Sequence, residues 1–333
     1  MIDKALNETV QSIRQKNLKK AKGCTKAGRW KERDVLDGEA VDVGVVVLPT
    51  KGCRWGRASG CTMCGYVYAA GSLSDEELST AFKDALSDLG DASYLKLFTS
   101  GSFFDPGEVS EELLSLIIEA VNEKCVRQFQ VESRPEFIKK EALKRVKGNL
   151  SSRLEVGIGL ESSSDLVRER CINKGFTFHD YEKAVKLCSS EGVYVKTYLL
   201  LKPPFILERE AIEDTVKSAV DAARAGSSKA SINPMNIQRG TLVELLWKRG
   251  EYKPPWLWSL VEALKQISKS NLDIPVFSHP SGAGTRRGVH NCGRCDPSVI
   301  KAVKEFSLTQ DIDVLDALDC TCKRHWSDYL LLE

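Results

Sequence analysis

Short apolar runs alternate with amphipathic stretches along most of the chain. Six of the runs predict strands, over residues 43–48, 94–98, 129–131, 154–158, 193–201 and 230–237. Between them, apolar positions at helical spacing predict helices over residues 75–89, 108–123, 139–146, 179–190 and 212–225. Strands and helices that alternate in this way indicate parallel βαβ units with right-handed crossovers. The pattern predicts an α/β protein with a partial (β/α)6 barrel, although periodicity alone does not distinguish a barrel from an open sheet.

The pattern changes at both ends of the chain. A basic helix is expected over residues 3–22, followed by a glycine-containing connector. Beyond residue 237, a helix is expected near residues 257–268, a short strand near 275–279 and a Gly/Arg loop at 282–288. A cysteine-rich tail with short helices follows. We therefore expect three parts: a basic segment (1–40), the barrel (41–285) and a metal-binding module (286–333).

Composition and charge narrow the class of protein to which the chain can belong. With 333 residues, of which 42% are apolar, the chain can form a globular core, and its net charge of +2 indicates no partner. No apolar run approaches the ~20 residues of a membrane span, and residues 1–20 lack the apolar centre of a secretory signal. We therefore expect a soluble cytoplasmic protein with no membrane partner. In such a protein, clusters among the eleven cysteines indicate metal rather than disulfides.

Three cysteines, Cys53, Cys61 and Cys64, lie in a Gly/Arg-rich loop directly after the first predicted strand. Structural zinc takes four ligands, whereas a [4Fe-4S] cluster held by three thiolates leaves one iron free to bind a further ligand. The spacing therefore favours a [4Fe-4S] cluster. The alternatives are loop cysteines without metal, or a zinc site that borrows a His or an Asp.

The loop and the following strand ends resemble the radical SAM superfamily, particularly its Elongator-like members. The resemblance rests on the cysteines, on Tyr66, and on segments 99–105 (TSGSFFD), 132–136 (ESRPE), 155–162 (EVGIGLES) and 172–175 (INKG). One departure is the spacing Cys-x7-Cys-x2-Cys, where the superfamily usually has Cys-x3-Cys-x2-Cys; the longer gap only enlarges a loop. The resemblance implies that S-adenosylmethionine (SAM) binds the free iron and is cleaved to a 5′-deoxyadenosyl radical.

The resemblance also implies which residues contact SAM. Tyr66 would lie against the adenine, and the backbone of the turn Ser100-Gly101-Ser102 would receive the amino group. Glu132 would bond the ribose hydroxyls.

Two further positions depart from the superfamily pattern. Glu161 stands where relatives have a Gln near the nucleoside, and Lys174 where they have an Arg that pairs with the SAM carboxylate. Taken singly, Glu132 and Glu161 are better explained as surface acids, and Lys174 as a helix cap. Their shared position at the C-terminal ends of predicted strands, where parallel barrels carry active sites, favours the cofactor interpretation.

Four downstream segments give a more specific resemblance, to the radical SAM proteins of archaeosine biosynthesis. They are residues 196–205 (KTYLLLKPPF), 233–241 (NPMNIQRGT), 252–258 (YKPPWLW) and 287–296 (RGVHNCGRCD). The resemblance implies a tRNA substrate modified at position 15 of the D-loop, where a partner subunit has attached lysine to 7-cyano-7-deazaguanine. The radical would abstract hydrogen from the lysyl carbon next to nitrogen, and cleavage of the C–N bond would leave archaeosine. An external electron donor is implied as well.

The catalytic residues are not determined by this resemblance. Tyr198, Asn233, Asn236 and Gln238 lie near predicted strand ends and are candidates for substrate contact. Ordinary packing at the barrel rim is an equally good explanation for each.

Four further cysteines, Cys292, Cys295, Cys320 and Cys322, form two close pairs near the C-terminus. Four thiolates are the set that structural zinc prefers, so Zn²⁺ is expected here. A second iron–sulfur cluster is the next alternative and unbound thiols the last, with His290 and His325 as spare ligands. Cys125, Cys171 and Cys188 are expected to be core or near-core thiols, and Cys24 is unassigned.

Basic residues near these cysteines are candidates for tRNA contact, since cations and aromatic rings suit phosphates and bases. They are Lys301, Lys304, Lys323 and Arg324, together with Trp326. The segment from residue 14 to 33, with nine Lys or Arg and the single acid Glu32, is interpreted in the same way, although a solvated helix explains it nearly as well.

Two other functions compete with this hypothesis. One is a different radical SAM tRNA enzyme, such as a methylthiotransferase or an Elongator-like protein, although their extra domains do not fit this length. The other is a zinc-bound RNA-binding scaffold without enzymatic activity.

Overall fold

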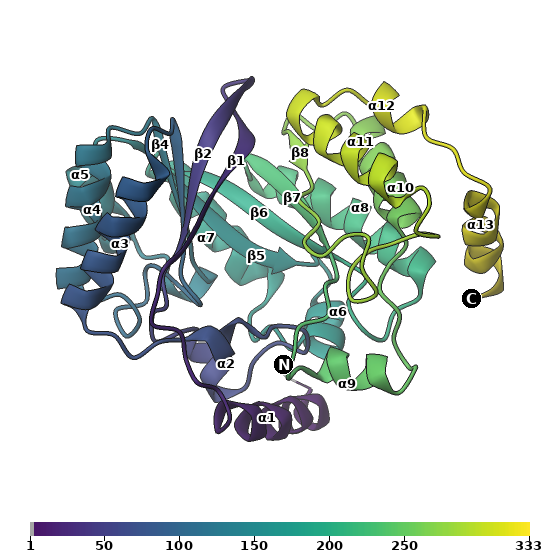
Figure 1. Cartoon of the computed structure of the whole chain (residues 1–333), viewed down its shortest axis with the longest axis horizontal. Coiled ribbons are helices and arrows are strands. Elements are labelled where there is room, and N and C mark those ends of the chain that lie inside the picture. Colours follow the sequence, from purple (N-terminus) through teal and green to yellow (C-terminus); the bar gives the residue numbers. More distant parts are fainter. Residues whose placement is uncertain (1–2) are drawn as a thin grey trace.

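One curled sheet forms the centre of the protein, as shown by a computed structural model that describes residues 3–333 (Figure 1). Its eight strands follow the chain order: β1 (Gly28–Leu36), β2 (Glu39–Val47), β3 (Tyr94–Phe98), β4 (Gln128–Glu132), β5 (Arg153–Glu161), β6 (Tyr194–Leu201), β7 (Lys229–Pro234) and β8 (Val276–Phe277). β1 and β2 are antiparallel, and all later neighbours are parallel. The six predicted parallel strands are β2 to β7, so the partial barrel is confirmed.

Helices pack against the convex side of this sheet and enclose the main apolar core. The crossover helices are α3 (Asp75–Leu89), α4 (Glu111–Lys124), α5 (Lys140–Asn149), α7 (Phe178–Ser190) and α8 (Glu208–Ala225). The alternation along β3 shows how the two faces differ: Leu95 and Leu97 join this core, whereas Tyr94 and Lys96 do not. None of the described helices combines the length and apolarity of a membrane span.

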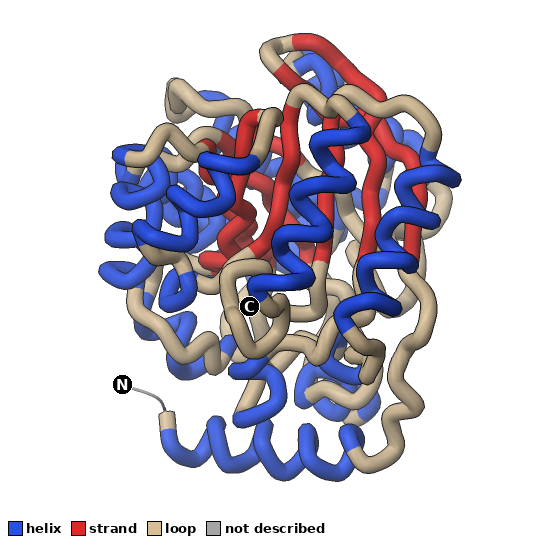
Figure 2. Tube along the Cα trace, turned by 90° about the vertical axis from the view of Figure 1, so that its left-hand side faces the viewer, coloured by secondary structure: helices blue, strands red, loops and turns tan. Residues whose placement is uncertain are grey.

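The remaining helices lie at the ends of the sheet, apart from two in the last part of the chain. α1 (Lys4–Leu18) lies across the strand ends near the N label of Figure 2. The short helices between strands are α2 (Arg54–Ala58), η1 (Tyr66–Ala69), η2 (Pro135–Phe137), α6 (Asp165–Val167) and η3 (Arg168–Ile172). The last part of the chain contains α9 (Leu242–Lys248), which the sequence pattern did not predict, and α10 (Leu257–Lys269), α11 (Asp296–Thr309), α12 (Asp313–Asp316) and α13 (Cys322–Leu332). Of these, α10 and α11 pack against α8 and the strands β7, β8 and β1.

Two expectations are wrong. The connector expected before residue 40 contains a strand, since β1 pairs along its whole length with β2. The reason is the two-residue turn Asp37-Gly38, in which both residues have positive φ (55° and 80°), as a tight hairpin requires. Cys125 is exposed rather than buried, because it ends α4 with φ 56°; Cys171 and Cys188 are buried as predicted.

The concave face of the sheet carries buried charges. Lys96 on β3 and Lys196 on β6 are 3% and 2% exposed, and both face Asp34 of β1, which is 1% exposed. Asp34 Oδ2 lies 2.5 Å from Lys96 Nζ and 3.4 Å from Lys196 Nζ. Burial alone would raise the pKa of Asp34, but the two ammonium groups outweigh it and hold the pKa well below its usual range. β1 therefore supplies the counter-charge that allows both lysines to be buried.

The tip of the β1–β2 hairpin is fixed to the opposite strands. Asp37 accepts hydrogen bonds from Arg153 at 2.8 and 2.9 Å and from Arg127 at 2.8 Å. Arg127 precedes β4 and Arg153 begins β5, so the hairpin reaches across the amino-terminal end of the sheet.

Replacing Asp34 by Ala should destabilise the fold strongly. The change leaves two buried ammonium groups without their shared partner, which typically costs about 3–5 kcal/mol. The low pKa of Asp34 stabilises the folded state only above the unfolded value of about 4, so the wild type should lose this contribution as pH falls below it, and the variant should not. Urea unfolding across pH measures both effects. The control Asp42→Ala, at an exposed carboxylate 3.7 Å from Arg33, should change stability by less than about 0.5 kcal/mol; an equal loss would contradict the argument.

Candidate functional site

The three-cysteine loop lies at the carboxyl end of β2. Cys53 begins α2, where its Sγ accepts the Gly56 N–H at 3.3 Å and its own N–H binds the Ser100 carbonyl at 3.1 Å. Cys61 is buried and Cys64 is half-buried. Burial raises the pKa of Cys61 to about 12; Lys174 opposes this rise, and the charges of Cys64 and Cys53 add to it. The three thiols are thus close enough to influence one another.

Helix α1 holds this loop through a buried arginine. Arg14 is 2% exposed and donates to the carbonyl oxygens of Cys64 at 2.7 Å and Cys61 at 3.1 Å. Its guanidinium also lies 5.1 Å from the centroid of the Tyr68 ring, and a Cβ on Gly60 would come within 2.5 Å of it. The expectation that the basic segment faces RNA is therefore wrong for Arg14, which instead completes the loop.

Two other segments hold the loop from the opposite side. Thr62 donates its N–H to Ile172 O at 2.9 Å and its hydroxyl to Cys171 O at 2.8 Å, both in η3. Gln238, after β7, accepts the N–H of Gly65 at 2.5 Å. Gln238 is thus a positioning residue for the loop in this structure, rather than a free group at the barrel rim.

The turn after β3 packs directly against Cys53. A Cβ on Gly101 would lie 2.5 Å from Cys53 Cα, so only glycine allows this approach. Glu108, which is 4% exposed, accepts the N–H of Ser102 and the hydroxyl of Thr50, each at 2.6 Å. Burial raises the pKa of Glu108, and these two hydrogen bonds oppose the rise. Sequence analysis placed Glu108 at a helix start and missed this role, because its partners are distant in sequence or in an irregular turn.

An ion pair closes the carboxyl end of β5. Lys174 Nζ lies 2.6 Å from Glu161 Oε1, and the two side chains are 12% and 13% exposed. Gly159 makes room for the pair, because a Cβ there would come within 2.9 Å of both groups. Glu161 is therefore not a surface acid, and Lys174 is not merely a helix cap.

Glu132, at the end of β4, is a second partly buried carboxylate of the site. Burial raises its pKa to about 7, although the Tyr198 hydroxyl and the Lys174 charge lower it. Gln130 Nε2 donates to the Tyr198 oxygen at 2.7 Å, which leaves the Tyr198 proton for Glu132. A Cβ on Gly157 would lie 2.8 Å from the Tyr198 ring, so this glycine allows the tyrosine to reach across β5.

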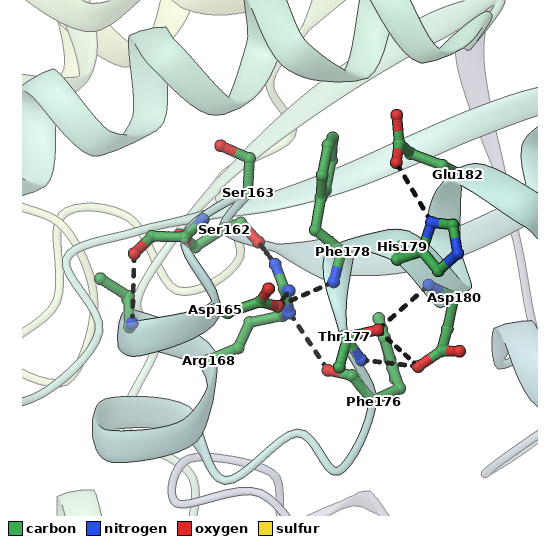
Figure 3. Close-up of polar contacts among 12 residues, drawn as sticks. Ser162, Ser163, Asp165, Arg168, Phe176, Thr177, Phe178, His179, Asp180 and Glu182 are labelled. Atoms are coloured by element: carbon green, nitrogen blue, oxygen red, sulfur yellow. Dashed lines mark hydrogen bonds and ion pairs between the residues drawn. The ribbon is translucent and has the colours of Figure 1, made fainter. Parts of the chain in front are cut away.

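A buried arginine fixes the segment that carries Lys174 (Figure 3). Arg168 is fully buried and binds Ser162 O, Asp165 Oδ1 and, at 3.3 Å, Phe176 O. Burial lowers its pKa to about 10. These contacts join both ends of the 162–176 segment, and they could not be predicted from the sequence because two of the three partners of Arg168 are backbone carbonyls.

The other predicted residues lie around the same edge of the sheet. Tyr66 begins η1 and is 61% exposed. Asn233 lies in β7, and Tyr198 lies within β6 rather than at its end. Asn236 follows β7 and packs against Gly282, whose Cβ position would be 2.9 Å from its Oδ1.

The C-terminal cysteines converge as predicted. The sulfurs of Cys292, Cys295, Cys320 and Cys322 all lie within 4.8 Å of one another, with separations of 3.7, 3.9 and 3.6 Å for the pairs 292–295, 292–320 and 295–322. This set includes neither His290 nor His325.

Donors surround these sulfurs. Trp258 Nε1 lies 3.2 Å from Cys322, Asn291 Nδ2 3.5 Å from Cys295 and Arg294 Nη2 3.9 Å from Cys320. The N–H of Cys322 and Arg294 lower the pKa of the Cys320 thiol to about 6. The surroundings therefore favour the thiolate at Cys320, whereas burial raises the pKa of Cys295 to about 12 and also raises the pKa of Cys322.

Arg14→Ala should destabilise the protein even without any ligand. Truncation leaves the Cys61 and Cys64 carbonyls without donors and opens a cavity, so we expect a loss of roughly 2–4 kcal/mol in urea unfolding. The neighbouring exposed Lys16 provides the control, and Lys16→Ala should lie within about 0.5 kcal/mol of wild type. Similar stabilities of the two variants would show that Arg14 does not support the loop.

No family model matches the chain, but known proteins resemble it along most of their length. Archaeosine synthase subunit beta of Methanosarcina acetivorans is 41% identical over 338 residues, covering 99% of this chain and 97% of the relative. The protein of the same name from Thermococcus kodakarensis is 39% identical, covering 89% of this chain and 94% of the relative. The fold resembles Methanocaldococcus infernus Elp3 lacking its N-terminus, at a TM-score of 0.52 and 19% identity, over 74% of this chain and 61% of that one. This likeness confirms the predicted Elongator-like radical SAM fold, and the identities show that the chain belongs to the archaeosine synthase subunit beta family.

Proposed function

We propose that this protein is a radical SAM enzyme of tRNA modification. Its substrate is the lysine adduct of 7-cyano-7-deazaguanine at position 15 of tRNA, and cleavage of the lysine C–N bond leaves archaeosine. Family membership supports the tRNA and the need for a lysine-transferring partner subunit. The observation that carries the proposal is the loop of Cys53, Cys61 and Cys64, held at the carboxyl end of the sheet, where parallel barrels carry active sites.

The residues of the loop suit a [4Fe-4S] cluster. The charges of Cys53 and Cys64 reach the Cys61 thiol, and the cations of Lys174 and Arg134 oppose part of the rise in its pKa that burial causes. Cations beside three thiolates balance the negative charge that the bound cluster adds. Cys53, Cys61 and Cys64 would hold the cluster, and the iron without a protein ligand would remain for SAM.

The surrounding side chains suit SAM. Lys174 uses one of its three N–H donors on Glu161, so further donors remain for a carboxylate. Glu132 is an acceptor whose partial burial favours hydroxyl donors from a ribose. The Ser100-Gly101-Ser102 turn approaches Cys53 closely, and the exposed Tyr66 ring is available to an adenine.

When bound, the cluster and SAM would supply a 5′-deoxyadenosyl radical, with the electron coming from an external donor. The role of the protein itself is to position the reactants and to exclude water. Tyr198 contacts Glu132, Asn233 lies in β7 and Asn236 follows it, and all three remain candidates for orienting the lysyl group. Gln238 acts through the cysteine loop, as a positioning residue.

The C-terminal cysteines suit a single zinc ion. A tetrahedron with Zn–S bonds of about 2.3 Å has sulfurs about 3.8 Å apart. The observed separations of 3.6 to 3.9 Å match this value, whereas a cubane cluster would hold its sulfur ligands farther apart. Zn²⁺ at this site would join α11 to α13 and act structurally.

Metal analysis tests the first part of the proposal. Anaerobically reconstituted protein should hold about four irons in the cysteine loop, and reduction in the presence of SAM should release 5′-deoxyadenosine. Cys53→Ala, Cys61→Ala and Cys64→Ala should each lose most of that iron and all of this product. The control Cys188→Ala, at a buried thiol outside the site, should keep both. Full iron content in the three variants would overturn the cluster assignment.

The substrate is tested with tRNA that carries the lysine adduct. Formation of archaeosine by the reduced enzyme supports the proposal. Release of 5′-deoxyadenosine without archaeosine would reject this substrate and keep the radical SAM class, whereas a protein that contains zinc but no iron would favour an RNA-binding scaffold.

The zinc site gives a separate prediction. Cys320→Ala should lose about one zinc per chain and lower the free energy of unfolding by at least about 2 kcal/mol, because metal bound to the folded site would contribute to folding. The control His325→Ala removes an exposed ring outside the sulfur set and should keep the zinc. Wild-type zinc content in Cys320→Ala would contradict the assignment.

A further inference from the structure

A cavity of about 300 Å³ opens beyond the carboxyl end of β6, apart from the cysteine loop. Its walls come from the β6–α8 connection, from α9 and the segment before α10, from the segment before Cys292, and from α13. The lining residues are Lys202, Trp247, Lys253, Pro254, Trp256, Arg286, His290, Asn291 and Tyr329. The size is at the small end of ligand sites and suits one nucleotide unit.

Three aromatic side chains make the walls flat and apolar. Trp256 and Tyr329 have ring centroids 6.2 Å apart. Trp247 is half-buried and packs into the small apolar cluster that also contains Cys61 and Cys64, so this cluster connects one wall of the cavity to the cysteine loop. Stacking of a base on such a ring is worth about 1–3 kcal/mol and tolerates any base.

The charge of the lining is positive and unbalanced. No Asp or Glu lines the cavity. Lys202 is paired with the buried Glu208 and is structural. Lys253 and Arg286 are exposed, and between residues 3 and 333 neither side chain has a hydrogen bond or an ion pair. Two free cations beside aromatic walls match a phosphate–base unit better than an acidic peptide, which would not use the flat rings.

We propose that this cavity binds an unpaired nucleotide of the tRNA substrate, next to the one that is modified. The base stacks on Trp247 or Trp256, and its flanking phosphates contact Lys253 and Arg286. This inference rests on the proposed function, because a nucleotide in a tRNA loop is recognised when its base is turned out and stacked. The cavity would then hold the RNA while the neighbouring base reaches the cysteine loop.

Binding of labelled, unmodified tRNA transcript to the apoprotein tests this inference without cluster or SAM. The double variant Lys253→Ala/Arg286→Ala should bind at least about 10-fold more weakly, and the slope of log affinity against log salt should decrease by about 1.5. Trp247→Leu, which keeps an apolar side chain in the cluster, should bind about 5- to 100-fold more weakly with an unchanged slope. The matched control Lys83→Ala/Lys144→Ala removes two exposed cations on α3 and α5, at the opposite side in Figure 1, and should bind like wild type.

Other outcomes of the same experiment would overturn the inference. Wild-type affinity and salt slope in both cavity variants would overturn the inference, as would an equal loss in the control. If wild type does not bind the transcript but binds the partner subunit, and the Lys253/Arg286 variant loses that binding, the occupant is a protein and the inference fails. Iron content and 5′-deoxyadenosine release by the unaltered chain test the proposed function separately, so the failure of one is distinguishable from the failure of the other.

Discussion

The neutralisation of charge inside the curled sheet is the constraint on which this fold depends. Lys96 and Lys196 are buried on the concave face, where an isolated ammonium group would be prohibitively costly. Asp34 is the acid that both can reach, and it lies on β1, the antiparallel strand that precedes the barrel. The hairpin is therefore part of the barrel's interior, although it lies outside the βαβ repeat. Its tip is fixed as well, since Asp37 binds arginines at the starts of two distant strands.

Hydrogen bonds from other segments of the chain hold the cysteine loop in place. The loop is long and has little regular structure, yet four separate segments bind it through buried donors and acceptors: Arg14 from α1, Ser100 after β3, Cys171 and Ile172 from η3, and Gln238 after β7. A loop supported in this way has already lost most of its conformational entropy before any ligand binds. The longer gap between the first two cysteines is thus compensated by contacts, in particular by α1 against Gly60.

The elements and sites that depend on a local sequence pattern could be predicted from the sequence. Those that depend on contacts between residues far apart in the chain could not. The βαβ alternation gave six strands and five crossover helices, and cysteine spacing gave the four-sulfur set, because these are repeated or closely spaced signals. The β1–β2 hairpin has a local turn signal, Asp37-Gly38, but the basic composition of the segment favoured a helix followed by a connector. Arg14 looked like one of many solvated cations, and only the fold shows that it is buried. The roles of Arg168 and Glu108 could likewise not be predicted from the sequence, since these residues bind backbone groups that come together only in the folded chain.

The four C-terminal cysteines connect the fold of the tail to the cavity that we propose as a nucleotide-binding site. Cys292 follows His290 and Asn291, and Cys322 begins α13, which carries Tyr329. Bringing the four sulfurs together therefore sets two walls of the aromatic cavity against each other, while Trp258 on α10 binds Cys322 and extends the support to the barrel. The tail packs onto the main apolar core through residues such as Val299, Phe306 and Trp326, and the sulfur set adds a further constraint on these walls. The sulfur set, which follows the cavity-lining residues His290 and Asn291, and the cysteine loop, which does not line the cavity, thus serve different purposes. The loop provides the ligands for the proposed chemistry, and the tail forms walls of the cavity that we propose for the RNA chain.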